Sequence, residues 1–242
     1  MNNQLLLQYL WNALPAIPDQ NSGQSGHNTT NPRYNATDII EVVDWPEFNY
    51  AAIMHQYGGI LNAKQIRSDP FLFPPRLIRN EQDFHYRFAQ LLLDRVRRGL
   101  RAGFEELAPH LQQLRLVPVT VEEGGSAAFI DNYKPDTACV LVGGIFYDST
   151  NRAPGDLKNA YLQNEYKQVL SQVNWYMGQH HARYGFVLTN NELMAVKRLD
   201  TNGRLAVSAS IPWTAGGPGQ LSVALGMWYV CMLAADMADW RL

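Results

Sequence analysis

Two aspartates and one lysine stand where predicted strands begin and end. Asp136 follows Pro135 at the start of an apolar run, and Asp156 and Lys158 are two residues apart in a shorter segment. Because side chains alternate along a strand, Asp156 and Lys158 lie on the same face. Carboxylates on neighbouring strands are hard oxygen ligands for Mg²⁺, and a lysine beside them can orient water or offset charge on a phosphate. The pattern indicates metal-dependent phosphodiester hydrolysis.

A long helix precedes these strands. Apolar residues recur at helical spacing from Glu81 to Phe104, with Asn80 as the N-cap and with Glu81 and Asp83 in the first turn, where the helix dipole favours acids. Its last turns carry four arginines that we interpret as a solvated face: Arg95, Arg97, Arg98 and Arg101.

The rest of the chain alternates between strand and helix periodicity. The predicted elements are strands over 114–124 and 134–144, a short strand ending near Lys158, a helix over 164–184, strands over 183–191, 192–200 and 205–213, and a helix over 220–236. This order predicts a mixed α/β fold with a central sheet.

Before the long helix the pattern is less regular. Residues 2–14 read as a short amphipathic helix, and residues 38–66 read as one or two helices. We expect an N-terminal helix in 1–17, a flexible polar linker in 18–37, and a single domain in 38–242 with its core at about 80–236.

Composition excludes several classes of protein. The chain has 242 residues, of which 46% are hydrophobic, so it can bury a sizeable core. Its net charge of −2 argues against a protein that coats nucleic acid by bulk positive charge. Cys139 and Cys231 are too few for a disulfide framework and read as buried thiols. The apolar stretch from Leu221 to Ala235 fits a core helix, so we expect a cytoplasmic or nuclear protein that binds no membrane.

Several segments together resemble a known superfamily. KPDTACVLV, PGDLK, QVLSQVNWYM and the terminal LSVALGMWYVCMLAAD are similar to the PD-(D/E)XK nucleases, and more closely to the nuclease-like domains of filamentous fungi, over roughly residues 80–236. The resemblance implies a restriction-endonuclease-like α/β core, in which helices flank a central mixed sheet, with a helical extension at the N-terminus.

The resemblance also implies roles for six residues. It makes Asp136, Asp156 and Glu81 ligands of Mg²⁺ or Mn²⁺, and it makes Lys158 the catalytic lysine. Gln172 and Tyr176 match a Q-x-x-x-Y helix whose side chains line the site beside the metal. Asp83 is a rival for the helix acid. The implied substrate is DNA or RNA.

Two other functions remain open. One is a tRNA-dependent arginine-containing cyclodipeptide synthase on a repurposed nuclease fold, which uses aminoacyl-tRNA and no metal cofactor. The acids Asp136, Asp156 and Glu81 would then bind a guanidinium group. The other is a non-catalytic module that binds nucleic acid or protein. His85 and His110 are interpreted as surface or core residues, and His180 and His181 as residues at a helix C-terminus, where the helix dipole favours histidine.

Overall fold

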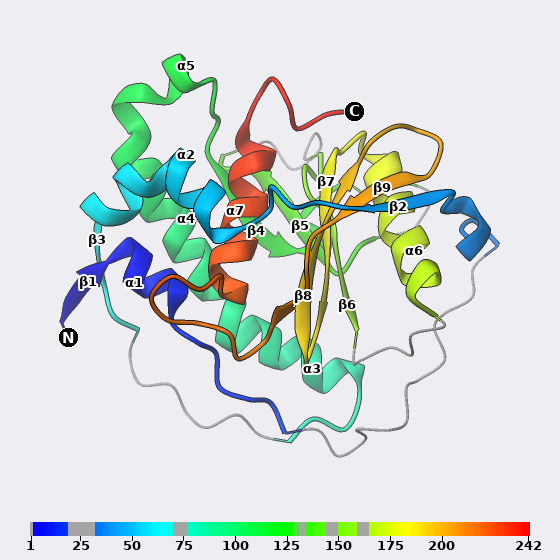
Figure 1. Ribbon diagram of the computed structural model, residues 1–242, viewed down its shortest axis with the longest axis horizontal. Coiled ribbons are helices and arrows are strands. Elements are labelled where there is room, and N and C mark those ends of the chain that lie inside the picture. Colours follow the sequence, from blue (N-terminus) through cyan, green and yellow to red (C-terminus); the bar gives the residue numbers. More distant parts are fainter. Residues whose placement is uncertain are drawn as a thin grey trace.

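The structure is a computed structural model that describes residues 2–18, 32–69, 77–128, 130, 134–143, 150–158 and 165–242, without the side chain of Glu81 (Figure 1). Most of the predicted linker, at 19–31, lies outside this description. The described residues include no helix that is long and apolar enough to cross a bilayer.

The N-terminal third forms helices and short strands around one end of the molecule. In chain order these are β1 (Asn3–Leu5), α1 (Leu6–Trp11), the 3₁₀ turn η1 (Ala36–Asp38), β2 (Glu41–Asp44), α2 (Tyr50–Ala63) and β3 (Gln65–Arg67). β1 and β3 pair antiparallel in a small two-stranded sheet. Leu6 and Leu10 of α1 are fully buried, and α1 packs against α4 and α7, so this helix docks on the rest of the fold.

The long helix begins at Glu81, as the sequence predicts. It consists of α3 (Glu81–Phe88), a π-helical turn η2 (Ala89–Leu93) and α4 (Asp94–Leu107). Asn80 caps it, because its side chain accepts a hydrogen bond from the Asp83 N–H at 2.8 Å. The short η3 (Ala108–His110) and α5 (Leu111–Leu114) then lead into the sheet.

The central sheet follows the predicted order of strands. Its elements are β4 (Val119–Glu123), the turn η4 (Gly124–Ser126), β5 (Thr137–Leu141), β6 (Gly155–Lys158), α6 (Tyr166–Gln179), β7 (Tyr184–Thr189), β8 (Glu192–Arg198), β9 (Arg204–Val207), β10 (Ile211–Pro212) and α7 (Val223–Ala235). The strand order is β2-β9-β8-β7-β6-β5-β4, and β10 pairs with β8. β4, β5 and β6 run antiparallel in succession, whereas β6 and β7 are parallel with α6 between them in the chain.

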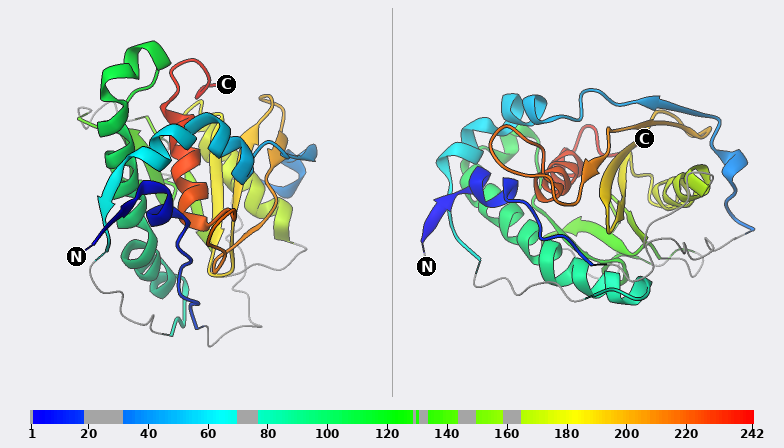
Figure 2. Two further views of the ribbon diagram at one scale, coloured as in Figure 1. Left: turned by 60° about the vertical axis from the view of Figure 1, so that its left-hand side comes forward. Right: turned by 60° about the horizontal axis from the view of Figure 1, so that its bottom comes forward.

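Helices cover both faces of this sheet (Figure 2). Alternate residues of β7 divide between two cores: Phe186 and Leu188 join the cluster that contains α7, α4 and α1, whereas Val187 joins a smaller cluster with α6. The fold is a mixed α/β structure with a central mixed sheet flanked by helices, which confirms the predicted class.

Two expectations outside the sheet core are only partly right. One or two helices were expected in 38–66, and α2 is one of them, but the region also forms β2 and β3, and β2 extends the central sheet by pairing parallel with β9. The four arginines of α4 are solvated only in part: Arg101 is exposed, whereas Arg95 is only 5% exposed and binds Asp69. Both differences arise from partners distant in the sequence, which local periodicity does not report.

Two glycines allow close approaches of the backbone beside the aspartates. A Cβ on Gly124 would overlap the carbonyl oxygen of Pro135, and the Gly124 N–H donates to the Asp136 carbonyl at 2.9 Å. A Cβ on Gly155 would overlap both the Phe186 ring and the Thr137 hydroxyl. Glycine at 124 therefore lets the turn after β4 reach the backbone of Asp136, and glycine at 155 lets β6 lie close to β5 and β7.

Candidate active site

Asp156 and Lys158 lie on the same face of β6, as the alternation of side chains along a strand predicts. Both side chains lie on the α6 side of β6, and Lys158 Nζ is 3.2 Å from Asp156 Oδ2. Asp156 is 1% exposed and Lys158 is 8% exposed, so this is a buried ion pair. Leu157, between them in the strand, turns to the opposite, apolar face of the sheet.

α6 supplies the polar partners of this pair. Its Gln172 side-chain amide donates to Asp156 Oδ1 at 3.0 Å and to the Tyr176 hydroxyl at 3.3 Å. The two residues are four positions apart and share one face of the helix, as their spacing requires. Burial raises the pKa of Tyr176, so its hydroxyl stays protonated. The structure thus brings together Asp156, Lys158, Gln172 and Tyr176.

Asp136 joins this group from the start of β5. Its Oδ2 accepts a hydrogen bond from the Leu157 N–H at 2.8 Å, and Thr137 pairs with Gly155 across the two strands. Burial raises the pKa of Asp156 well above its ordinary value, and the nearby carboxyl of Asp136 raises it further, whereas Lys158 opposes the shift. The two carboxyl groups therefore act on each other directly, at the point where β5 and β6 begin.

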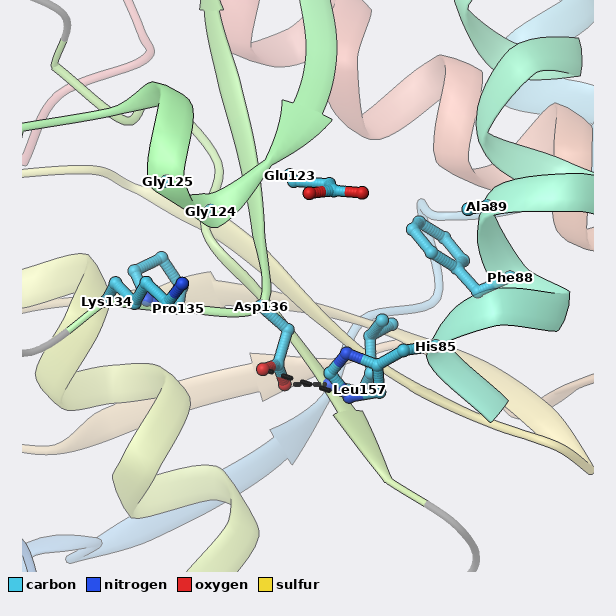
Figure 3. Close-up of a pocket in the computed structure, with 10 residues that line it drawn as sticks. All are labelled: His85, Phe88, Ala89, Glu123, Gly124, Gly125, Lys134, Pro135, Asp136 and Leu157. Atoms are coloured by element: carbon cyan, nitrogen blue, oxygen red, sulfur yellow. Dashed lines mark hydrogen bonds and ion pairs between the residues drawn. The ribbon is translucent and has the colours of Figure 1, made fainter. Parts of the chain in front are cut away.

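A cleft opens beside Asp136 on the α3 side (Figure 3). Its volume is about 330 Å³. His85 and Phe88 of α3 form one wall, and His85 Nε2 lies 3.9 Å from Asp136 Oδ1. The remaining lining residues are Ala89, Glu123, Gly124, Gly125, Lys134, Pro135 and Leu157. Asp136 thus lies between the buried polar cluster and the open cleft.

Sequence reasoning missed the position of His85. It was interpreted as a surface or core residue, yet it faces Asp136 in the cleft. A signal was present in the sequence: His85 follows Glu81 by four residues, and residues at this spacing share one face of a helix.

Of the two candidate helix acids, the structure describes the side chain of Asp83. Glu81 is the first residue of α3, and its side chain lies outside the described part of the structure. Asp83, the rival candidate, accepts a hydrogen bond from the Arg79 N–H at 3.0 Å. This bond ties Asp83 to the start of its own helix.

The donor set fits a divalent cation at two carboxylates. Asp156 Oδ2 is buried, and among the described residues no donor makes a well-directed hydrogen bond to it, although Lys158 lies beside it. A buried carboxylate oxygen next to a second carboxylate is a suitable pair of ligands for Mg²⁺ or Mn²⁺. The described His, Cys, Asp and Glu side chains form no group of three around one point.

Comparisons with protein-family models, with curated proteins and with solved structures found no match to this chain. The geometry of the cluster and of the cleft is therefore the basis for the functional argument.

Proposed function

We propose that this protein is a divalent-metal-dependent phosphodiesterase that acts on nucleic acid and belongs to the PD-(D/E)XK nucleases. The observation that carries the proposal is the convergence of Asp136, just before β5, with Asp156 and Lys158 of β6: the Leu157 N–H binds Asp136, and Lys158 Nζ lies 3.2 Å from the buried Asp156. Two carboxyls beside one lysine carry an excess of negative charge, which a bound cation would neutralise.

The order of elements supports the same assignment. The chain forms five elements in succession. A helix that begins with an acid comes first, followed by a strand, the strand after Pro135–Asp136, the strand with Asp156-Leu157-Lys158, and the helix with Gln172 and Tyr176. This is the order on which the resemblance rests.

Each residue has a distinct task in the proposed reaction. Asp136 and Asp156 would hold the metal ion, which when bound lowers the pKa of a water and stabilises negative charge on the phosphate. The Leu157 N–H orients Asp136, and the Gln172 amide orients Asp156. Lys158 Nζ places a positive charge beside the phosphate oxygens, where charge grows in the transition state.

The test is cleavage of nucleic acid by the purified full-length protein. Plasmid, single-stranded DNA and total tRNA are incubated with Mg²⁺ or Mn²⁺ and, separately, with EDTA. We expect metal-dependent cleavage that falls by roughly 10²–10⁴-fold in Asp136→Asn and in Lys158→Met, because each substitution removes a group that acts on the reacting phosphate.

Matched controls separate chemistry from folding. Asp44→Asn and Lys167→Met change exposed residues of the same types away from the cluster, and both should cleave like the wild type. Cleavage that survives in both site variants, or that persists in EDTA, would overturn the proposal. A folded wild-type protein that binds nucleic acid without cutting it would instead indicate a binding module.

One feature of the cleft favours the synthase as a second candidate. The Glu123 side chain faces the Phe88 ring across the cleft, and this side chain makes no hydrogen bond or ion pair with the described residues (Figure 3). A planar guanidinium can stack on an aromatic ring while a carboxylate binds its two N–H groups. Incubation with charged tRNA, read by mass spectrometry, tests this candidate. An arginine-containing cyclic dipeptide formed in EDTA would favour it, and its loss in Glu123→Gln but not in Glu122→Gln would locate the pocket.

A further inference from the structure

Two side chains of opposite charge line the cleft beside Asp136 without pairing. Glu123 ends β4 and Lys134 precedes β5, and both belong to the lining of the cleft. Neither side chain makes a hydrogen bond or an ion pair with any residue that the structure describes. Glu122, by contrast, accepts a hydrogen bond from Arg97. The cleft therefore offers a ligand one carboxylate and one ammonium group.

The walls of the cleft suit a flat ring. Phe88 and Ala89 of α3 form an apolar wall, and the Glu123 side chain faces Phe88 from the other side (Figure 3). Gly124 and Gly125 continue the lining without side chains, and a Cβ on Gly125 would meet no atom within 4 Å. The volume of about 330 Å³ is that of a site for one small ligand, such as a single nucleotide.

A carboxylate beside an apolar wall distinguishes one nucleobase from the others. The unpaired edge of guanine carries two adjacent donors, N1–H and the N2 amino group, and a carboxylate accepts from both at once. Adenine and cytosine each have an acceptor beside the amino group, and uracil has its N–H between two acceptors. In a duplex this edge of guanine is already paired, so only an unpaired guanine can make the contact.

We propose that the cleft binds one unpaired guanine nucleotide of a nucleic acid, with the guanine edge on Glu123, the base against Phe88 and a backbone phosphate at Lys134. Asp136 lies two residues after Lys134 in the same lining, so the next phosphate reaches the carboxylates of the polar cluster. The inference deepens the proposed function by naming its substrate, single-stranded nucleic acid that contains guanine. It rests on that function only for cleavage, because binding is measurable separately.

The direct test is binding of nucleosides to the full-length protein in EDTA, followed by NMR titration. Guanosine should bind about ten-fold more tightly than adenosine, cytidine or uridine, because it alone donates two adjacent hydrogen bonds to a carboxylate. Equal affinities for the four nucleosides would overturn the proposal.

Glu123→Gln tests which residue selects guanine. The substitution replaces one carboxylate oxygen by an NH₂ group, which cannot accept a hydrogen bond, so the preference for guanosine should disappear. Glu122→Gln is the matched control, because it changes the same type of residue one position earlier and outside the lining of the cleft. It should keep the preference. A preference that survives in Glu123→Gln would overturn the proposal.

Two further variants place the ligand in the cleft. Lys134→Met should weaken the binding of 5′-GMP about three-fold and leave that of guanosine unchanged, because only 5′-GMP carries a phosphate. Gly125→Leu should block guanosine by filling the cleft, whereas Gly59→Leu should not, although an added Cβ meets no atom within 4 Å at either position. Guanosine that binds Gly125→Leu as it binds the wild type, or 5′-GMP that is indifferent to Lys134→Met, would contradict the placement.

Cleavage gives a second readout and separates this inference from the proposed function. A single-stranded oligonucleotide with one guanine should be cut beside that guanine, and about ten-fold more slowly in a duplex, where the guanine must first be unpaired. If the wild type cuts nothing but prefers guanosine, the proposed function fails and the guanine site stands. If it cuts and shows no preference for guanosine, the guanine site fails alone. Arginine methyl ester that binds more tightly than guanosine would overturn the proposal in favour of the synthase.

Discussion

Asp69 and Asp156 both have charged neighbours, but the net charge of those neighbours differs: it is positive around Asp69 and not around Asp156. Asp69 follows β3 and accepts hydrogen bonds from the Tyr9 hydroxyl at 2.7 Å, from Arg95 Nε at 3.1 Å and from Arg98. Asp156 on β6 has one ammonium group, one amide and a second carboxyl as its neighbours. Asp69 thus has two cationic partners for one negative charge, whereas Asp156 and the neighbouring carboxyl of Asp136 have one lysine between them.

This difference separates a structural role from a reactive one. Asp69 joins α1, β3 and α4 through its three donors, which satisfy both of its oxygens. Asp156 keeps a raised pKa and an oxygen without a well-directed donor among the described residues. Burying a charge in this way costs stability, so a chain that keeps it is expected to use it in binding or chemistry.

The largest expected effect is on activity at Asp156. Asp156→Asn keeps the size of the side chain and removes its charge, so nucleic-acid cleavage should fall on the order of a thousand-fold. The free energy of unfolding should change little, because the cost of burying the Asp156 charge opposes what its pairing with Lys158 contributes. Cleavage assays and urea unfolding in EDTA check the two halves. A variant that loses stability as well as activity would make Asp156 structural, like Asp69.

The opposite result is expected at Asp69. Asp69→Asn leaves the buried Arg95 without a counter-charge, so the free energy of unfolding should fall by about 3 kcal/mol. Cleavage per folded molecule should remain at the wild-type level, because Asp69 touches none of the residues of the polar cluster. Urea unfolding measures the first quantity. A selective loss of cleavage without loss of stability would contradict the assignment.

The pH dependence of stability sharpens the contrast further. A carboxyl whose pKa is raised in the fold binds its proton more tightly there than in the unfolded chain, so its contribution favours folding at low pH and is lost as pH rises through the folded pKa. Relative to Asp156→Asn, the wild type should therefore lose stability as pH rises above about 4, the ordinary range of an aspartate. Urea unfolding at stepped pH in EDTA measures this difference. A difference that does not vary with pH would mean that Asp156 titrates normally.

Much of the polar cluster could be predicted because it depends on local patterns. Alternation along β6 puts Asp156 and Lys158 on one face, and helical spacing puts Gln172 and Tyr176 on one face of α6. The elements that carry them begin and end close to their predicted positions. Such relations hold within one strand or helix, where geometry alone decides which side chains meet.

Contacts between distant segments could not be predicted in this way. Nothing local to Arg95 indicates that Asp69, 26 positions earlier, will neutralise it. β2 exists as a strand because β9 pairs with it, across more than 160 positions. Tyr34 lies in a polar stretch, yet it is buried, and nearby Ala36 donates a hydrogen bond to Gln168, 132 positions later in the chain. In each case a tertiary partner decides the structure of a segment whose own residues are ambiguous.

The smallest expected effects come from the tyrosine beside each carboxylate. Tyr9 donates a hydrogen bond to Asp69, so Tyr9→Phe should lower the free energy of unfolding by about 1 kcal/mol and leave cleavage unchanged. Tyr176 accepts a hydrogen bond from the amide that holds Asp156, so Tyr176→Phe should lower kcat about five-fold with little change in stability.

The pair of variants tests the comparison itself, because the same atom is removed in each. Suppose that Tyr9→Phe and Tyr176→Phe lower the free energy of unfolding equally and that neither changes kcat. Each hydroxyl would then only contribute a stabilising hydrogen bond, and Asp69 and Asp156 would not differ in role. If the effects divide as expected, the hydroxyl at Asp69 stabilises a charge-balanced joint between helices. The hydroxyl at Tyr176 then acts through Gln172 on a carboxylate whose charge remains available for a metal ion.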